Sequence, residues 1–205
     1  MDDSSGYSEW INFTNHRLSR SLSQYDMTNN FVISYNYLLP LSKAFSALPK
    51  RLTEGWSVNG ITRFSTGLPT TISQGGDLSL TGSGSTDVPN FIGPLVIQDP
   101  RNSGPGGLPN QYFSPDGFAS GPLGAFGNSN RRFFHGPGIN NWDFALHKTT
   151  QLRESMSLQF RAEFFNIFNH AQFLNPTGNF TSSQFGEVTS ARDPRIGQLS
   201  LKLLW

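Results

Sequence analysis

The chain has 205 residues, which is enough for one domain with a hydrophobic core. Charged residues make up only 14% of the chain, well under the roughly 25% of soluble domains. The 21 Gly, 13 Pro and 18 Phe are typical of a β-rich protein with long loops. The net charge of +1 gives no electrostatic basis for binding nucleic acid, and the lack of cysteine excludes disulfides and thiolate metal sites.

The first third of the chain predicts two strands. Residues 1–29 are polar and rich in Ser and Asn, so we expect a loop there. Apolar residues then alternate over 30–39 and again over 55–66, as in strands whose side chains point to opposite faces in turn. The connection between them, residues 40–54, has room for a short helical turn.

The middle of the chain is a long segment dense in Gly, Pro, Ser and Asn, from Gly67 to about Pro137. A structureless loop of this length is improbable inside a compact domain. Two alternatives remain open. Either the segment carries small strands of its own, with 70–73 and 91–97 as candidates, or the protein tolerates very long loops on one side.

Three more strands are predicted near 140–151, 157–168 and 195–205, and residues 169–194 form a second long polar loop. The last strand has a fully apolar face and a polar face of Gln, Ser and Lys. Its apolar face carries Leu199, Leu201, Leu203 and Trp205.

The connections alternate between long and short, so in an antiparallel sheet all long loops lie at one end. Outer-membrane barrels show this asymmetry, with short periplasmic turns and long extracellular loops. We therefore predict an all-β fold: about five long antiparallel strands, part of a transmembrane β-barrel. Lys148 falls on the lipid face near the periplasmic end, where its long side chain can reach the membrane surface.

The opposite faces of these strands hold the ionisable residues that we expect to face the lumen. One interpretation is a charged wall that touches ligand or plug, and the other is a ladder of exposed ion pairs contributing about 0–1 kcal/mol each. The lumen-facing candidates are Arg63, Asp143, His147, Arg161, Glu163 and Lys202.

No group of residues predicts catalysis. The histidines have no metal-ligand spacing, and the carboxylates Asp143 and Glu163 lack the cleft that glycoside hydrolysis needs. We expect no enzyme, no metal and no cofactor. The long loops are better candidates for ligand binding, although their aromatic residues could instead pack the loops together; these are Phe91, Tyr112, Phe113, Phe118, Phe126, Phe133 and Phe134.

Several segments resemble the carboxyl-terminal barrel strands of TonB-dependent receptors, and the Oar-like group in particular. They are GWSVNGITRFSTGLPTTIS, RRFFHGPGINNWDFALHKTTQL, LQFRAEFFNIFNHAQFLNP and RIGQLSLKLLW. The resemblance covers most of the chain, and AEFFNIFNH and the aromatic terminus are its most specific parts. The receptors' plug, TonB box and amino-terminal domains have no counterpart here, and such transporters have about 22 strands. The resemblance thus implies a fragment, residues 1–205, of a longer receptor.

From this resemblance we expect a bacterial outer-membrane location and uptake of an unidentified bulky ligand, energised by TonB through the missing plug. It also implies that membrane lipid and the barrel assembly machinery are partners, the latter reading the terminal strand at Leu199, Leu201, Leu203 and Trp205. The alternative is a soluble β-sandwich module that binds glycans. Detergent dependence would distinguish the two.

Overall fold

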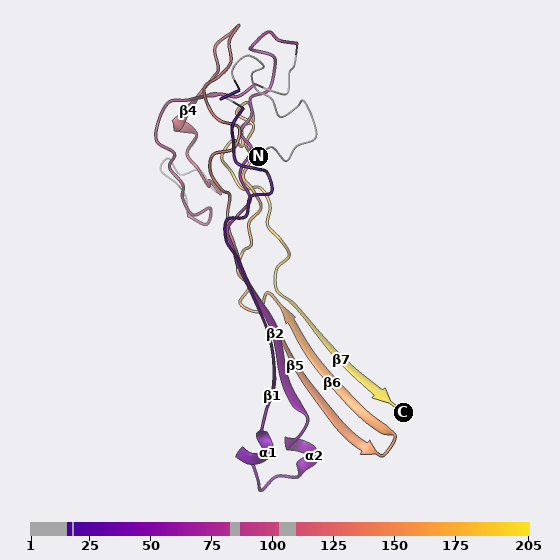
Figure 1. The fold of residues 1–205 in the computed structure, drawn as a ribbon. Helices are drawn as coiled ribbons and strands as arrows, with labels where there is room; N and C mark the ends of the chain where they lie inside the picture. Colours follow the sequence, from indigo (N-terminus) through magenta and orange to yellow (C-terminus); the bar gives the residue numbers. More distant parts are fainter. Residues whose placement is uncertain (1–15, 18, 83–86, 103–109) are drawn as a thin grey trace. The chain divides into compact units, whose positions relative to one another are not determined.

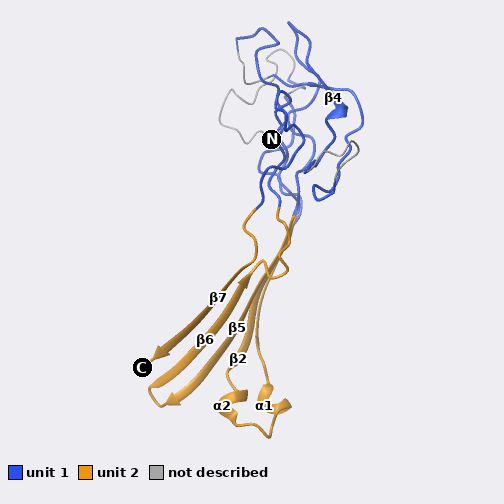
Figure 2. Ribbon diagram, turned by 180° about the vertical axis from the view of Figure 1, so that it is seen from behind, with its two compact units in different colours: residues 1–29, 66–138, 173–191 blue, residues 30–65, 139–172, 192–205 orange. Residues whose placement is uncertain are grey.

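The computed structural model describes residues 16–17, 19–82, 87–102 and 110–205. The chain divides into two compact units (Figure 2). Residues 30–65, 139–172 and 192–205 form the sheet unit, and residues 1–29, 66–138 and 173–191 form the loop unit. No helix among the described residues is long and apolar enough to cross a membrane.

The sheet unit contains one antiparallel sheet of five strands in the order β1-β2-β5-β6-β7 (Figure 1). This confirms the five predicted long strands. A two-residue turn joins β5 to β6, while every longer excursion into the loop unit leaves from the other end of the sheet. The strands are β1 (Asn30–Leu38), β2 (Trp56–Ser65), β5 (Ile139–Arg153), β6 (Met156–Phe165) and β7 (Ile196–Leu204).

The strand register gathers apolar side chains on one face of the sheet. Directly paired residues of an antiparallel ladder lie on the same face, so Tyr37, Val58, Leu146, Ala162 and Leu199 form one transverse row. The apolar face carries Phe31, Ile33, Tyr35, Tyr37, Trp56, Val58, Phe64, Trp142, Phe144, Leu146, Leu158, Phe160, Phe164, Leu199, Leu201 and Leu203. The predicted alternation therefore holds in one consistent orientation across all five strands.

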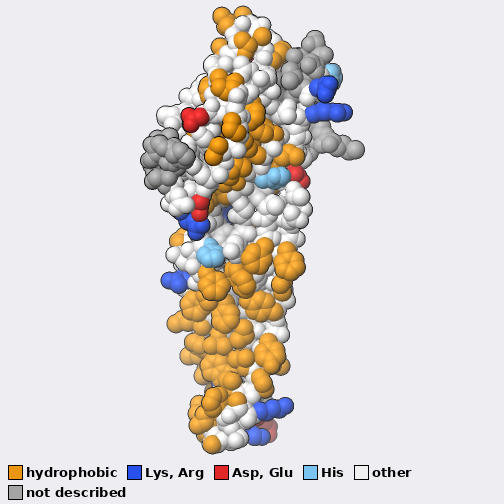
Figure 3. Space-filling view, turned by 90° about the vertical axis from the view of Figure 1, so that its left-hand side faces the viewer, with side chains coloured by type: hydrophobic (Ala, Val, Ile, Leu, Met, Phe, Trp, Pro, Cys, Tyr) orange, Lys and Arg blue, Asp and Glu red, His pale blue; other side chains and the backbone are white. Residues whose placement is uncertain are grey.

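The apolar face is open. Leu199 is 71% exposed and Leu201 is 67% exposed. Figure 3 shows hydrophobic side chains covering the strands on this side. Within the described part of the sheet unit, no second sheet covers them. A water-soluble sandwich would bury such a face, whereas a membrane strand presents it to lipid.

The loop-proximal end of β6 differs from the prediction, because the strand stops at Phe165 rather than at residue 168. Asn166 adopts a left-handed backbone conformation with φ of 50°, and its N–H donates to the Asp143 carboxylate at 3.0 Å. The regular ladder therefore ends, although the Ile167 N–H still donates to the Trp142 carbonyl of β5 at 2.9 Å. The ring of Phe168 then packs edge-on against Trp142, with 5.6 Å between centroids.

The connection between β1 and β2 holds two single-turn helices, α1 (Leu41–Ala44) and α2 (Lys50–Thr53). Two side chains of the apolar face reach α2: the Trp56 indole Nε1 donates to the Leu52 carbonyl at 2.8 Å, and the Lys148 Nζ donates to the carbonyls of Arg51 and Glu54. Because both donors project from the apolar face, α2 lies on that side of the strands. Lys148 also lies 5.4 Å from the Trp56 ring centroid.

The loop unit has its own core, built almost entirely from phenylalanine. Phe113 is completely buried, and its ring packs against Phe118, Phe134 and Phe185 at centroid distances of 5.8, 5.2 and 5.1 Å. Each of these pairs is tilted or edge-to-face, the arrangement that aromatic quadrupoles favour. The long middle segment is therefore not a structureless loop.

Each of the two alternatives for the middle segment is partly right, because the segment has small strands of its own but consists mostly of long loops. Among the described residues of this segment, regular structure is confined to β3 (Asn90–Phe91), the 3-10 helix η2 (Pro115–Gly117) and β4 (Phe118–Ala119), with β3 paired to β4. The candidate strand at 70–73 forms only an isolated bridge, between Ser73 and Asn179. Of the seven loop aromatics, six pack in or against the core: Phe91, Tyr112, Phe113, Phe118, Phe133 and Phe134.

Candidate functional site

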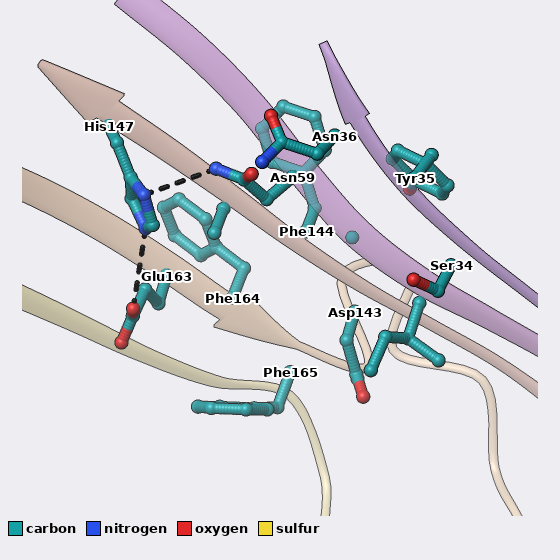
Figure 4. Close-up of a pocket in the computed structure, with 13 residues that line it drawn as sticks. Ser34, Tyr35, Asn36, Asn59, Asp143, Phe144, His147, Glu163, Phe164 and Phe165 are labelled. Atoms are coloured by element: carbon teal, nitrogen blue, oxygen red, sulfur yellow. Dashed lines mark hydrogen bonds and ion pairs between the residues drawn. The ribbon is translucent and has the colours of Figure 1, made fainter.

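The polar face of the sheet carries a chain of polar contacts centred on His147, one a hydrogen bond and the other an ion-pair contact. Ala145 lies directly between Asn59 of β2 and Glu163 of β6 in the register, and its methyl group leaves space there. His147, two residues further along β5, fills this space diagonally. Its Nδ1 lies 3.1 Å from Asn59 Nδ2, and its Nε2 lies 3.5 Å from Glu163 Oε1 (Figure 4).

The chain continues from Glu163 to the last strand, since Gln198 of β7 donates its side-chain Nε2 to Glu163 Oε2. On the other side, Asn36 of β1 pairs directly with Asn59 in the register. Polar groups on all five strands thus share one belt across the face. A belt of this kind can bind a solute through many neutral hydrogen bonds and few charges.

Residues of β1, β2, β5 and β6 line a hollow of about 440 Å³ at this belt. Small-molecule sites span roughly 300–1,000 Å³, so the hollow can hold a small ligand or part of a larger one. Figure 4 shows His147 between Asn59 and Glu163. The polar residues of the lining are Ser34, Asn36, Asn59, Asp143, His147 and Glu163.

Asp143 shares this face but its Oδ1 has a structural role. That oxygen accepts hydrogen bonds from the Asn141 side chain at 2.9 Å and from the Asn166 backbone at 3.0 Å. The carboxylate therefore fixes the turn that ends β6. This arrangement gives no support to a catalytic pairing of Asp143 with Glu163.

The register places the remaining predicted lumen residues on the same polar face. Arg63 Nε donates to Asn30 Oδ1 at 3.2 Å, and Arg161 donates from Nε and Nη2 to Gln159 Oε1. Lys202 of β7 lies opposite Gln159. The six predicted residues thus share a face but do not meet in one cluster, and only His147 and Glu163 interact directly with each other in the contacts described above.

Sequence reasoning missed the uncharged members of the belt, because it selected ionisable residues only. Asn36, Asn59 and Gln198 connect His147 and Glu163 to the outer strands. The usable signal was positional. Each of these residues alternates with apolar residues along its strand, so the alternation places it on the polar face. Matching the faces of neighbouring strands then places the three residues near the same level.

The predicted assembly-signal residues divide into two groups. Leu199, Leu201 and Leu203 lie on the apolar face of β7, and Trp205 follows the end of that strand with 89% of its surface exposed. This geometry presents an apolar strand face followed by an exposed indole ring.

Outside the strands, the ionisable groups with shifted pKa values lie in the loop unit. Hydrogen bonds from the Arg101 guanidinium lower the pKa of Asp99 to about 2, and the Nη2–Oδ2 distance is 2.5 Å. Burial raises the pKa of Tyr112, whose hydroxyl donates to the His135 carbonyl at 3.0 Å. Among the described residues, no three His, Asp or Glu side chains converge as a metal site would require.

An open single-layer sheet with a lipid-type face, a polar face and all long loops at one end defines a membrane β-barrel protein. A family model described as "Outer membrane beta barrel domain" matches residues 1–198. The chain belongs to this family, and its location is the bacterial outer membrane. A search of curated proteins gave no match, and a search of solved structures gave none.

The family and the open apolar face together argue against the soluble sandwich alternative. The five strands form part of a barrel wall, because the sheet does not close on itself. The outer edges of β1 and β7 have no strand partner among the described residues.

Proposed function

We propose that the chain is part of a TonB-dependent transporter that takes up a bulky ligand across the outer membrane. In this proposal the polar face lines the lumen, the loop unit is extracellular, and the turn between β5 and β6 is periplasmic. The lumen residues Arg63, Asp143, His147, Arg161, Glu163 and Lys202 then touch the ligand or a plug. The role is binding and transport rather than catalysis.

The observation that carries the proposal is the row of polar side chains across all five strands, which hydrogen bonds join between Asn59 and His147 and between Gln198 and Glu163. A wall that only excluded lipid would need no such ordered polar row, whereas a lumen that contacts a plug or ligand uses one. The belt combines donors from Asn59 and Gln198 with acceptors on Glu163. Its partners would be uncharged or weakly charged polar groups.

The loop unit supports uptake of a large ligand. Its phenylalanine core gives the long loops a fixed scaffold, and binding residues concentrate on loops that a rigid scaffold positions. The open edges of β1 and β7 also fit the proposal, because unpaired strand edges are not stable in hydrocarbon. Further strands would complete the wall, and the barrel assembly machinery would read Leu199, Leu201, Leu203 and Trp205.

Energised uptake is the property to test. Cells with and without the complete receptor that contains this chain are given fluorescent bulky solutes in turn: a ferric siderophore, an oligosaccharide and a peptide. The proposal expects at least one solute to accumulate only when the protein is present and the proton gradient is intact. Accumulation that survives collapse of the gradient would identify a passive pore, and no protein-dependent accumulation would reject transport of these solute classes.

A further inference from the structure

The segment between β1 and β2 has a surface composition that the transport proposal does not use. Phe45 is 54% exposed, Leu48 is 50% exposed and Leu52 is 61% exposed. The same segment carries Lys43, Lys50 and Arg51 against the single carboxylate of Glu54. Exposed apolar side chains beside cations are typical of segments that lie in a membrane surface.

The position of α2 places these exposed apolar and basic residues beside the apolar face of the sheet. Trp56 and Lys148 project from the apolar face, and both donate hydrogen bonds to α2 carbonyls. The helix is therefore held on the lipid side of the strands, at the end of the sheet where lipid tails give way to headgroups. Figure 3 shows hydrophobic side chains continuing to this end, where Lys and Arg side chains gather.

Beside α2 lies a second hollow, of about 530 Å³, between the helix and the projecting end of β5. Three cations line it, Lys50, Arg51 and Arg153, together with the carboxyl residues Glu54 and Glu154. Lys50 lies 3.9 Å from Glu54. The lining thus has a net positive charge, and guanidinium groups can bind a phosphate through two parallel hydrogen bonds.

We propose that this segment is a lipid-anchoring site that binds the phosphate headgroup of an anionic phospholipid. The headgroup occupies the hollow beside α2, and Phe45, Leu48 and Leu52 contact its acyl chains. The occupant is a phospholipid because the site is continuous with the lipid-facing surface and because it combines cations with apolar side chains. The assignment to the periplasmic leaflet rests on the orientation in the proposed function.

The test uses the full chain in neutral detergent, titrated with dioleoyl phosphatidylglycerol or dioleoyl phosphatidylcholine, with bound lipid counted by native mass spectrometry. Each basic residue near an anionic lipid surface raises affinity roughly fivefold, so the triple variant Lys50→Gln, Arg51→Gln, Arg153→Gln should lose about 100-fold for phosphatidylglycerol. Its affinity for phosphatidylcholine should fall much less, because the choline cation offsets the phosphate charge of that lipid. If the triple variant fails to fold by circular dichroism, Arg51→Gln alone should lose about fivefold.

A matched control removes the same charge elsewhere. The variant Arg20→Gln, Arg101→Gln, Arg192→Gln changes three cations outside the hollow and should bind phosphatidylglycerol as the wild type does. Leu48→Ser should weaken the binding of both lipids, because it removes acyl-chain contact.

Three results would overturn the proposal. They are equal wild-type affinity for the two lipids, an equal loss in the control triple, and full displacement of phosphatidylglycerol by inorganic phosphate, which would indicate a site for a soluble anion. None of them bears on uptake, which involves neither α2 nor this lipid. The two proposals can therefore fail separately.

Discussion

Replacing Leu201 by Arg tests the assignment of the two faces. Leu201 pairs with Phe160 on the apolar face and is 67% exposed. The nine residues of β7, rising about 3.3 Å each at a tilt of about 40°, cover roughly 23 Å, close to the apolar band of about 25 Å. Leu201 lies one residue from the centre of β7. An Arg at this depth on the lipid face costs about 2–4 kcal/mol, or roughly 30-fold to 1,000-fold in the folding equilibrium.

The neighbouring residue provides a control at the same depth. Ser200 lies on the polar face opposite Arg161, so Ser200→Arg brings two guanidinium groups together at a cost below about 1 kcal/mol. The assay is the heat and urea resistance of the membrane-inserted protein, followed by gel mobility. Leu201→Arg should sharply reduce the folded fraction and Ser200→Arg should barely change it. Equal tolerance of both substitutions would refute the face assignment.

Three further substitutions test individual contacts. Lys148→Met leaves the carbonyls of Arg51 in α2 and of its C-cap residue Glu54 without their donor. The helix should therefore dock about 1–3 kcal/mol less stably, which faster amide hydrogen exchange at Glu54 would show. Phe113→Ala should destabilise the loop unit by about 3–5 kcal/mol and expose it to protease, whereas Phe126→Ala, outside the core, should not. Arg101→Gln should return the pKa of Asp99 from about 2 toward 3.8 in an NMR titration. Since the folded pKa is lowered, the Asp99–Arg101 contact stabilises the protein at pH values above 3.8 and is lost as the pH falls through about 2.

The strands and their faces could be predicted because alternation is a local property. A strand that meets lipid on one side and polar groups on the other must alternate at period two, and a one-residue slip would reverse every side chain. The register then follows from matching faces. The position of Lys148 on the apolar face was also predictable, but its partners were not, because the carbonyls of Arg51 and Glu54 come from a helix about 95 residues earlier in the chain.

The loop unit could not be predicted because its order comes from contacts between distant segments. Phe113 and Phe185 meet across more than seventy residues of sequence, and neither lies in a periodic pattern. The end of β6 was missed for a related reason. Ile167 and Phe168 continue the apolar run, but the Asp143 carboxylate accepts a hydrogen bond from the Asn166 backbone N–H, and Asn166 adopts a left-handed conformation that turns the chain.

The separate phenylalanine core of the loop unit has a consequence for how such a protein can diversify. Each excursion into that unit starts and finishes at the same end of the sheet, so its segments can lengthen, shorten or be exchanged without altering strand pairing. In the proposed transporter, ligand preference and the integrity of the wall can therefore change independently. In the proposed transporter, transplanting residues 66–138 and 173–191 together into a related wall should transfer specificity, whereas transplanting one of them alone would break the aromatic packing that the two share.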